Sequence, residues 1–126
     1  MIVPNNEIQS YRDLRVWQKG MDLAEACYSI TKEFPKEEMY AMTSQIRRAA
    51  VSIPANISEG YGREYRAEYV QFLRIAQGSL KELETHLILS ARVKLTTSQA
   101  INPILTECES LGKMLRSLIR SLGGHK

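Results

Sequence analysis

The sequence predicts an all-α fold, an antiparallel four-helix bundle with up-down-up-down topology. Apolar residues recur at helical spacing in four successive stretches, the connections between these stretches are short, and no segment alternates as a β-strand would. The 126 residues are enough for one domain with a sizeable core. We expect the bundle to occupy residues 10–123 and residues 1–9 to form a flexible N-terminal arm.

The first helix is expected to begin at Ser10, an N-cap with Asp13 three residues later, and to run to Phe34. Its apolar residues form two adjacent seams that together cover about 200° of the helix surface, whereas a bundle core needs little more than about 100°. This helix therefore has surplus apolar surface. The first seam comprises Leu14, Trp17, Met21, Ala24, Tyr28 and Thr31, and the second comprises Val16, Leu23, Cys27, Ile30 and Phe34.

The second helix is expected over residues 39–59, with Gly60 as a left-handed cap. Its interior contains Pro54, which cannot donate a hydrogen bond to the carbonyl of Ala50. Several small residues would allow another backbone to approach closely. The core stripe is Ile46, Ala50, Ile53 and Ile57, and the small residues are Ala49, Ala50, Ser52, Ala55 and Ser58.

The last two helices show one clear seam each. The third is expected over residues 64–94, and the fourth begins after Thr96, which forms a capping box with Gln99. The inward positions of the third are Tyr69, Phe72, Leu73, Ala76, Leu80, Leu83, Leu87 and Ala91. Those of the fourth are Ile101, Ile104, Leu105, Cys108, Leu111, Leu115, Leu118, Ile119 and Leu122.

Composition sets the broad class of the protein. The net charge of +3 is mildly basic and only weakly favours a polyanionic partner. Cys27 and Cys108 lie on apolar helix faces and are expected to be buried, reduced thiols. The N-terminus has no apolar signal segment, and charges interrupt every apolar run before 18 residues. We therefore expect a cytoplasmic protein without a membrane span.

Three segments closely resemble a known family: Tyr11-Arg12-Asp13-Leu14 with Val16-Trp17, then TSQIRRAAVSIPANISEGYGR at residues 43–63, then Gln77-Gly78-Ser79-Leu80 with Glu82-Leu83-Glu84. The chain resembles, from about Tyr11 to Leu122, the four-helix-bundle proteins first described from intervening sequences within bacterial 23S ribosomal RNA genes. The segment SIPANISEG at residues 52–60 is the most specific part, since it is not a general helix motif.

The resemblance implies a left-handed four-helix bundle that commonly assembles into a homopentamer. A more distant relative is the accessory variability determinant of diversity-generating retroelements, a basic pentameric barrel that binds nucleic acid and a reverse transcriptase. The family has no established enzymatic activity. The resemblance therefore favours ring assembly and, more weakly, association with nucleic acid.

The first candidate site is an assembly surface on the first two helices. A long exposed apolar stripe favours aggregation unless another subunit covers it. The alternative is an irregular bundle whose loops cover these residues. The candidate interface residues are Val16, Leu23, Ile30, Val51, Pro54 and Ala55.

The second candidate site is a cluster of arginines and tyrosines that could hold phosphates and stack on bases of RNA or DNA. The alternative is that the tyrosines pack at the end of the bundle and the arginines pair with Glu59, Glu64 and Glu68. The cluster comprises Arg47, Arg48, Tyr61, Arg63, Tyr65, Arg66 and Tyr69, with Arg74 as an extension.

No arrangement of residues identifies a reaction, so we expect no enzyme, no cofactor and no metal site. His86 and His125 are isolated, and the Glu-x-x-His pairs of di-iron bundles are absent. The sequence favours a non-enzymatic homo-oligomeric scaffold, pentameric by resemblance, that binds a protein or nucleoprotein partner. The alternative is a nucleic-acid-binding protein that acts alone through its basic cluster.

Overall fold

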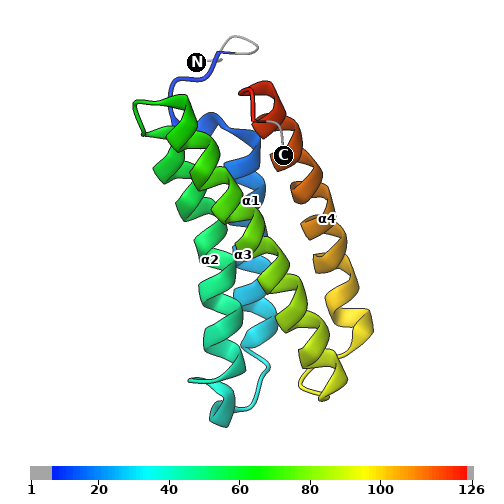
Figure 1. Ribbon diagram of the computed structural model, residues 1–126. Helices are drawn as coiled ribbons and strands as arrows, with labels where there is room; N and C mark the ends of the chain where they lie inside the picture. The colour runs from blue at the N-terminus through cyan, green and yellow to red at the C-terminus, as the bar shows by residue number, and fades with distance from the viewer. Residues whose placement is uncertain (1–6, 125–126) are drawn as a thin grey trace.

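The computed structural model describes residues 7–124, and over this range it contains four α-helices and no β-strand (Figure 1). The helices are α1 (Arg15–Thr31), α2 (Met42–Tyr61), α3 (Arg66–Arg92) and α4 (Ser98–Ser121). Each helix packs against the helices before and after it in the chain, and α4 also packs against α1. The four helices and the absence of strands from this range confirm the all-α class. Successive helices run in opposite directions, which is compatible with the predicted up-down-up-down topology (Figure 1). The left-handed arrangement stays a prediction.

The start of the bundle differs from the prediction in one respect. Ser10 does form a capping box with Asp13, but it caps a short 3-10 turn at Tyr11–Asp13. Leu14 is extended and interrupts the helical run, so α1 begins only at Arg15 and ends at Thr31. Most of the expected N-terminal arm, residues 1–6, lies outside the described residues.

Helix α2 begins at Met42 rather than Met39, because a second 3-10 turn at Lys36–Glu38 occupies the connection. Glu38 lies just before α2, and its Oε1 accepts a hydrogen bond of 3.2 Å from the Met42 N–H. The prediction of a left-handed cap at Gly60 is wrong, since α2 continues through it to Tyr61. The C-cap residue is Gly62, whose φ of −78° is not left-handed.

Gly60 is required by close packing between α2 and α3. A Cβ added there would lie 2.7 Å from Cβ of Phe72 and 3.2 Å from the carbonyl oxygen of Tyr69. Gly78, in the middle of α3, has no such neighbour, because an added Cβ would have nothing within 4 Å. Gly60 therefore has a packing role inside the bundle, and Gly78 has none.

The last two helices also end close to their predicted limits. Helix α3 covers residues 66–92 of the expected 64–94. The N-cap of α4 is Thr97, one residue later than the predicted Thr96, and its Oγ1 accepts a hydrogen bond of 3.0 Å from the Ala100 N–H.

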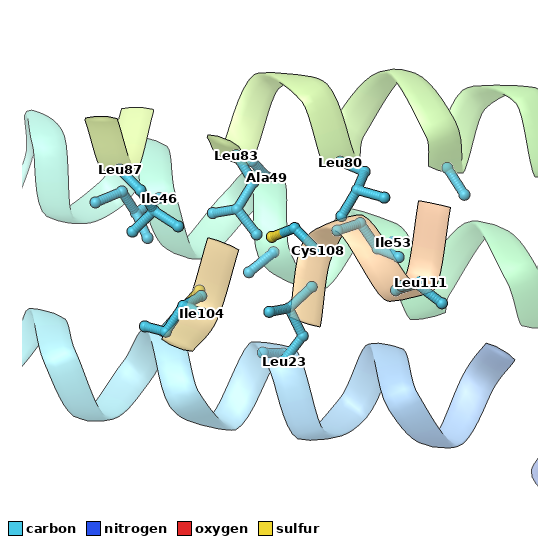
Figure 2. Close-up of a cluster of buried hydrophobic side chains, with 14 of the residues drawn as sticks. Leu23, Ile46, Ala49, Ile53, Leu80, Leu83, Leu87, Ile104, Cys108 and Leu111 are labelled. Atoms are coloured by element: carbon cyan, nitrogen blue, oxygen red, sulfur yellow. The ribbon is translucent and has the colours of Figure 1, made fainter. Parts of the chain in front are cut away.

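All four helices contribute to one hydrophobic core. Figure 2 shows part of it, with Leu23 of α1 in the same cluster as side chains from α2, α3 and α4. Cys27 and Cys108 are buried in this core, as predicted, and burial raises the pKa of both thiols to about 12. Both side chains therefore act as small apolar groups. The largest fully buried side chains include Ile46, Ile53, Ile57, Leu73, Leu80, Leu83, Leu87, Leu111 and Leu115.

The two glycines give a matched test of helix packing. Gly60→Ala should lower the free energy of unfolding by about 1–3 kcal/mol, because the methyl group has no room between α2 and α3. Gly78→Ala should raise it by about 0.5–1 kcal/mol, because alanine favours the helix and nothing obstructs the methyl group. Urea unfolding followed by circular dichroism measures both changes. Effects of the same sign would contradict the packing described here.

Candidate functional site

The side of α1 that remains exposed differs from the predicted one. Val16 and Leu23 were expected to be surplus to the core, but only 6% and 3% of their surfaces are exposed, and Figure 2 draws Leu23 inside the core. The assignment of these two residues to an outer apolar seam is therefore wrong. Ile30 is half-buried and also packs against the core. The bundle has buried the second seam of α1 and left part of the first seam outside.

The exposed apolar surface is a groove between α1 and α2, which we call the α1/α2 groove. Met21 and Tyr28 of α1 and Val51 of α2 are each about 40% exposed along it. Ala24 and Pro54 are buried, and the hollow measures about 490 Å³. Of the predicted interface residues, Val51 is exposed in this groove, whereas Pro54 lines it but is buried, and Met21 and Tyr28 were missed. Their place in the first seam was the signal that could have identified them.

Pro54 sets how closely the two helices approach. A Cβ added at Gly20 of α1 would lie 3.3 Å from Cβ of Pro54, so the absence of a side chain at Gly20 accommodates the proline ring. The ring thus faces α1 and lines the groove, while Ala55, the next residue, is exposed. Helix α2 continues through Pro54 without interruption.

Arg47 crosses from α2 to α1 beside the groove. Its guanidinium carbon lies 4.5 Å from the centre of the Tyr28 ring, and its Nε–H donates a hydrogen bond of 2.9 Å to Thr31 Oγ1. A cation near the C-terminal end of α1 also interacts favourably with the helix dipole. Arg47 therefore holds α1 and α2 together. A second hollow of about 400 Å³ extends the groove past this residue and is lined by Tyr28, Arg47, Arg48, Val51 and Ser52.

The predicted basic and aromatic cluster is divided between two places. Arg47 and Tyr61 are 14 positions apart on one helix, which separates them by roughly 21 Å along its axis. Arg47 and Arg48 therefore lie far from the turn between α2 and α3, which carries the remaining residues of the cluster except Arg74. Arg74 is half-buried on α3, two turns beyond the first residue of that helix.

At the turn between α2 and α3, some arginines and tyrosines of the cluster make internal contacts. Such contacts were the expected alternative to nucleic-acid binding. Arg63 pairs with Glu59 at 2.8 Å and lies over the Phe72 ring at 4.8 Å. Tyr61 and Tyr69 pack edge to face, with ring centres 6.0 Å apart. Among residues 7–124, the members of the cluster at this turn that show no such side-chain contact are Tyr65, which is 63% exposed, and Arg66, which is also exposed.

The described residues offer little for catalysis. Residues 7–124 contain no group of three or more His, Cys, Asp or Glu side chains placed to hold a metal ion. The raised pKa values of the two buried thiols disfavour the reactive thiolate form. The prediction that the protein is not an enzyme remains a prediction.

None of the helices in the described part of the chain is long and apolar enough to cross a membrane.

Arg47 and Arg48 differ sharply in their contacts and provide a matched pair of variants. Arg47→Ala should lower the free energy of unfolding by about 1–2 kcal/mol, because it removes the stack on Tyr28 and the hydrogen bond to Thr31. Arg48→Ala should change it by less than about 0.5 kcal/mol, as at most exposed positions. Urea unfolding of both variants at one protein concentration checks this, and equal losses would refute the bridging role of Arg47.

Comparison with known proteins identifies the family. The sequence matches the model of the 23S rRNA-intervening sequence protein over residues 12–117. The fold is similar to the crystal structure of a protein of unknown function from the S23 ribosomal protein family of Bacteroides thetaiotaomicron. The two are 28% identical with a TM-score of 0.74, and the match covers 82% of this chain and 97% of that one. No curated protein matches the chain. Because the family model covers most of the sequence, the chain belongs to the 23S rRNA-intervening sequence protein family.

Proposed function

We propose that the protein is a non-enzymatic scaffold that assembles with copies of itself and presents repeated surfaces to a protein or nucleoprotein partner. The observation that carries this proposal is the α1/α2 groove. Three large apolar side chains, Met21, Tyr28 and Val51, are about 40% exposed there, side by side over a buried floor. A single exposed apolar residue needs no explanation, whereas a contiguous hollow group of them is typical of an interaction site.

The borders of the groove fit the anatomy of a protein interface. Its centre is apolar, and the charged residues Glu25, Lys32 and Arg48 lie along its edges. Protein interfaces commonly have such an apolar centre and a polar rim. The rim would fix the position of the second copy, and the centre would provide most of the affinity.

The number of copies in the proposed assembly rests on the family resemblance, which favours five. A closed ring uses two different faces of each subunit, so the groove of one copy would meet another face of the next copy. Five copies would also present each partner-binding surface five times. Repetition of a weak site raises the overall affinity for an extended partner.

Val51→Glu tests the proposed assembly. A carboxylate in the centre of the apolar groove should dissociate the assembly to monomers of 14.4 kDa while helix content is retained, because Val51 is exposed and is not part of the core. Sedimentation measures the mass, and circular dichroism measures the helix content. Val93→Glu, an exposed valine at the end of α3, is the matched control and should leave the mass unchanged. A wild-type protein that sediments as a monomer at micromolar concentration would refute assembly.

A second candidate function is nucleic-acid binding at the turn between α2 and α3. Its support is that Tyr65 and Arg66 are adjacent, exposed and without the internal contacts that engage Arg63. An exposed tyrosine ring can stack on a base, and the neighbouring guanidinium can pair with a phosphate. Because one such pair is a weak site, this function would depend on the repeated copies of an assembly.

A salt titration with single-stranded RNA and duplex DNA tests this second candidate. The affinity should fall steeply as salt increases, because phosphate contacts release counterions. Arg66→Gln should weaken binding, whereas Lys113→Gln, which removes the same charge from the exposed side of α4, should have little effect. The absence of binding even near about 50 mM salt would eliminate this function.

A further inference from the structure

A further hollow, with different chemistry, lies between α2 and α3, and it shares Arg48 and Ser52 with the hollow that extends the α1/α2 groove. It measures about 500 Å³, which is within the usual range for small-molecule sites. We call it the α2/α3 cleft. Unlike the α1/α2 groove, it is lined mainly by polar side chains. Its lining comprises Tyr40 and Ala41 before α2, Ser44, Gln45, Arg48, Ala49 and Ser52 on α2, and Ser79 and Glu82 on α3.

Opposite charges line this cleft without pairing. Arg48 comes from α2 and Glu82 from α3, and no ion pair within 4.0 Å joins them in the described chain. Arg48 forms no ion pair with any other carboxylate of residues 7–124 either. A guanidinium group binds carboxylates through paired N–H donors, and a carboxylate such as Glu82 binds an ammonium group. The cleft thus offers one site for each sign of charge.

Uncharged polar groups are fixed on the wall of the cleft. The hydroxyls of Ser52 and Ser79 hydrogen-bond to each other at 2.8 Å, and Asn56 Nδ2 donates to Ser52 Oγ at 2.9 Å. One hydroxyl proton is used between the two serines, so the other remains available as a donor. These contacts hold the wall in one arrangement, since a single network links both helices.

A buried histidine nitrogen lies behind Glu82. His86 Nε2 is 3.5 Å from Glu82 Oε2, and it is the one buried side-chain nitrogen or oxygen of the described residues without a hydrogen-bond partner. Folded proteins seldom leave such an atom unpaired, and the exceptions often mark functional positions. His86 does not line the cleft, so this atom is a neighbour of the Glu82 carboxylate and not a contact for a ligand.

We propose that the α2/α3 cleft binds a small zwitterion, a free α-amino acid. Arg48 binds the α-carboxylate, Glu82 binds the α-ammonium group, and the Ser52–Ser79 pair provides hydroxyl contacts beside them. The side chain of the amino acid extends toward Tyr40, which is 96% exposed at the rim of the cleft. A ligand with one charge can contact only one of Arg48 and Glu82, whereas a zwitterion can contact both, so the two opposite charges favour both groups on one molecule.

This proposal is tested by measuring the binding of free L-amino acids to the full chain. Each amino acid is screened separately by ligand-observed NMR, and calorimetry measures the affinity of those that bind. At least one amino acid should bind. Arg48→Gln and Glu82→Gln should each lower its affinity at least about tenfold, because each removes a charge-assisted contact. Arg116→Gln, which removes an exposed cation from α4, should leave the affinity unchanged. Circular dichroism of each variant confirms that the bundle is intact.

Single-charge probes separate this proposal from a simple anion site. Acetate and methylamine should each bind at least about tenfold more weakly than the amino acid. Acetate binding as tight as that of the amino acid would show an anion site and overturn the proposal. Failure of all amino acids to bind, or unchanged affinity in both cleft variants, would also overturn it. Glu82→Gln separates this proposal from the scaffold function, because Glu82 does not line the α1/α2 groove, whereas Arg48 lies on its rim. The mass of the assembly is therefore measured for each variant, and loss of amino-acid binding at an unchanged mass concerns the cleft alone.

Discussion

The close packing of α2 against both of its neighbours is the constraint on which the rest of the molecule depends. On one side, Pro54 meets α1 where Gly20 has no side chain, and on the other, Gly60 lies directly against Phe72 of α3. The hydrogen bond between Ser52 and Ser79 joins α2 to α3 along the same side. Small residues are needed at these points because protein interiors have little free volume, so a larger side chain would hold the helices apart. The α1/α2 groove and the α2/α3 cleft flank this one closely packed helix, so its position fixes the shape of both.

Much of the fold could be predicted because the signals for it are local. The helical spacing of apolar residues identified four helices, and the capping box at Ser10 was correct even though it caps a 3-10 turn. The assignment of faces on α1 failed for a physical reason. Periodicity gives the angle between two residues around a helix, but it does not say which angle points to the core. On a helix with two apolar seams, either one could be buried, and the neighbouring helices selected the seam that contains Val16 and Leu23.

The candidate sites were predicted only in part, because side-chain partners come from other helices. Val51 and Pro54 were placed on an apolar surface, and the groove that they line was completed by Met21 and Tyr28 of α1. The basic cluster was drawn from residues near in sequence, yet a straight helix separates its two ends. The partners of Arg47, which are Tyr28 and Thr31, lie before the connection that precedes α2, so no local pattern could indicate them.

The single tryptophan of the chain lies at an informative place. Trp17 is half-buried, contacts the ring of Tyr11 edge to face at 5.3 Å, and precedes Met21 by one helical turn. Its indole therefore adjoins the N-terminal 3-10 turn and packs against the core. Since the emission of an indole depends on its surroundings, the native chain carries its own optical label where this turn meets the bundle, and no dye has to be attached to observe events there.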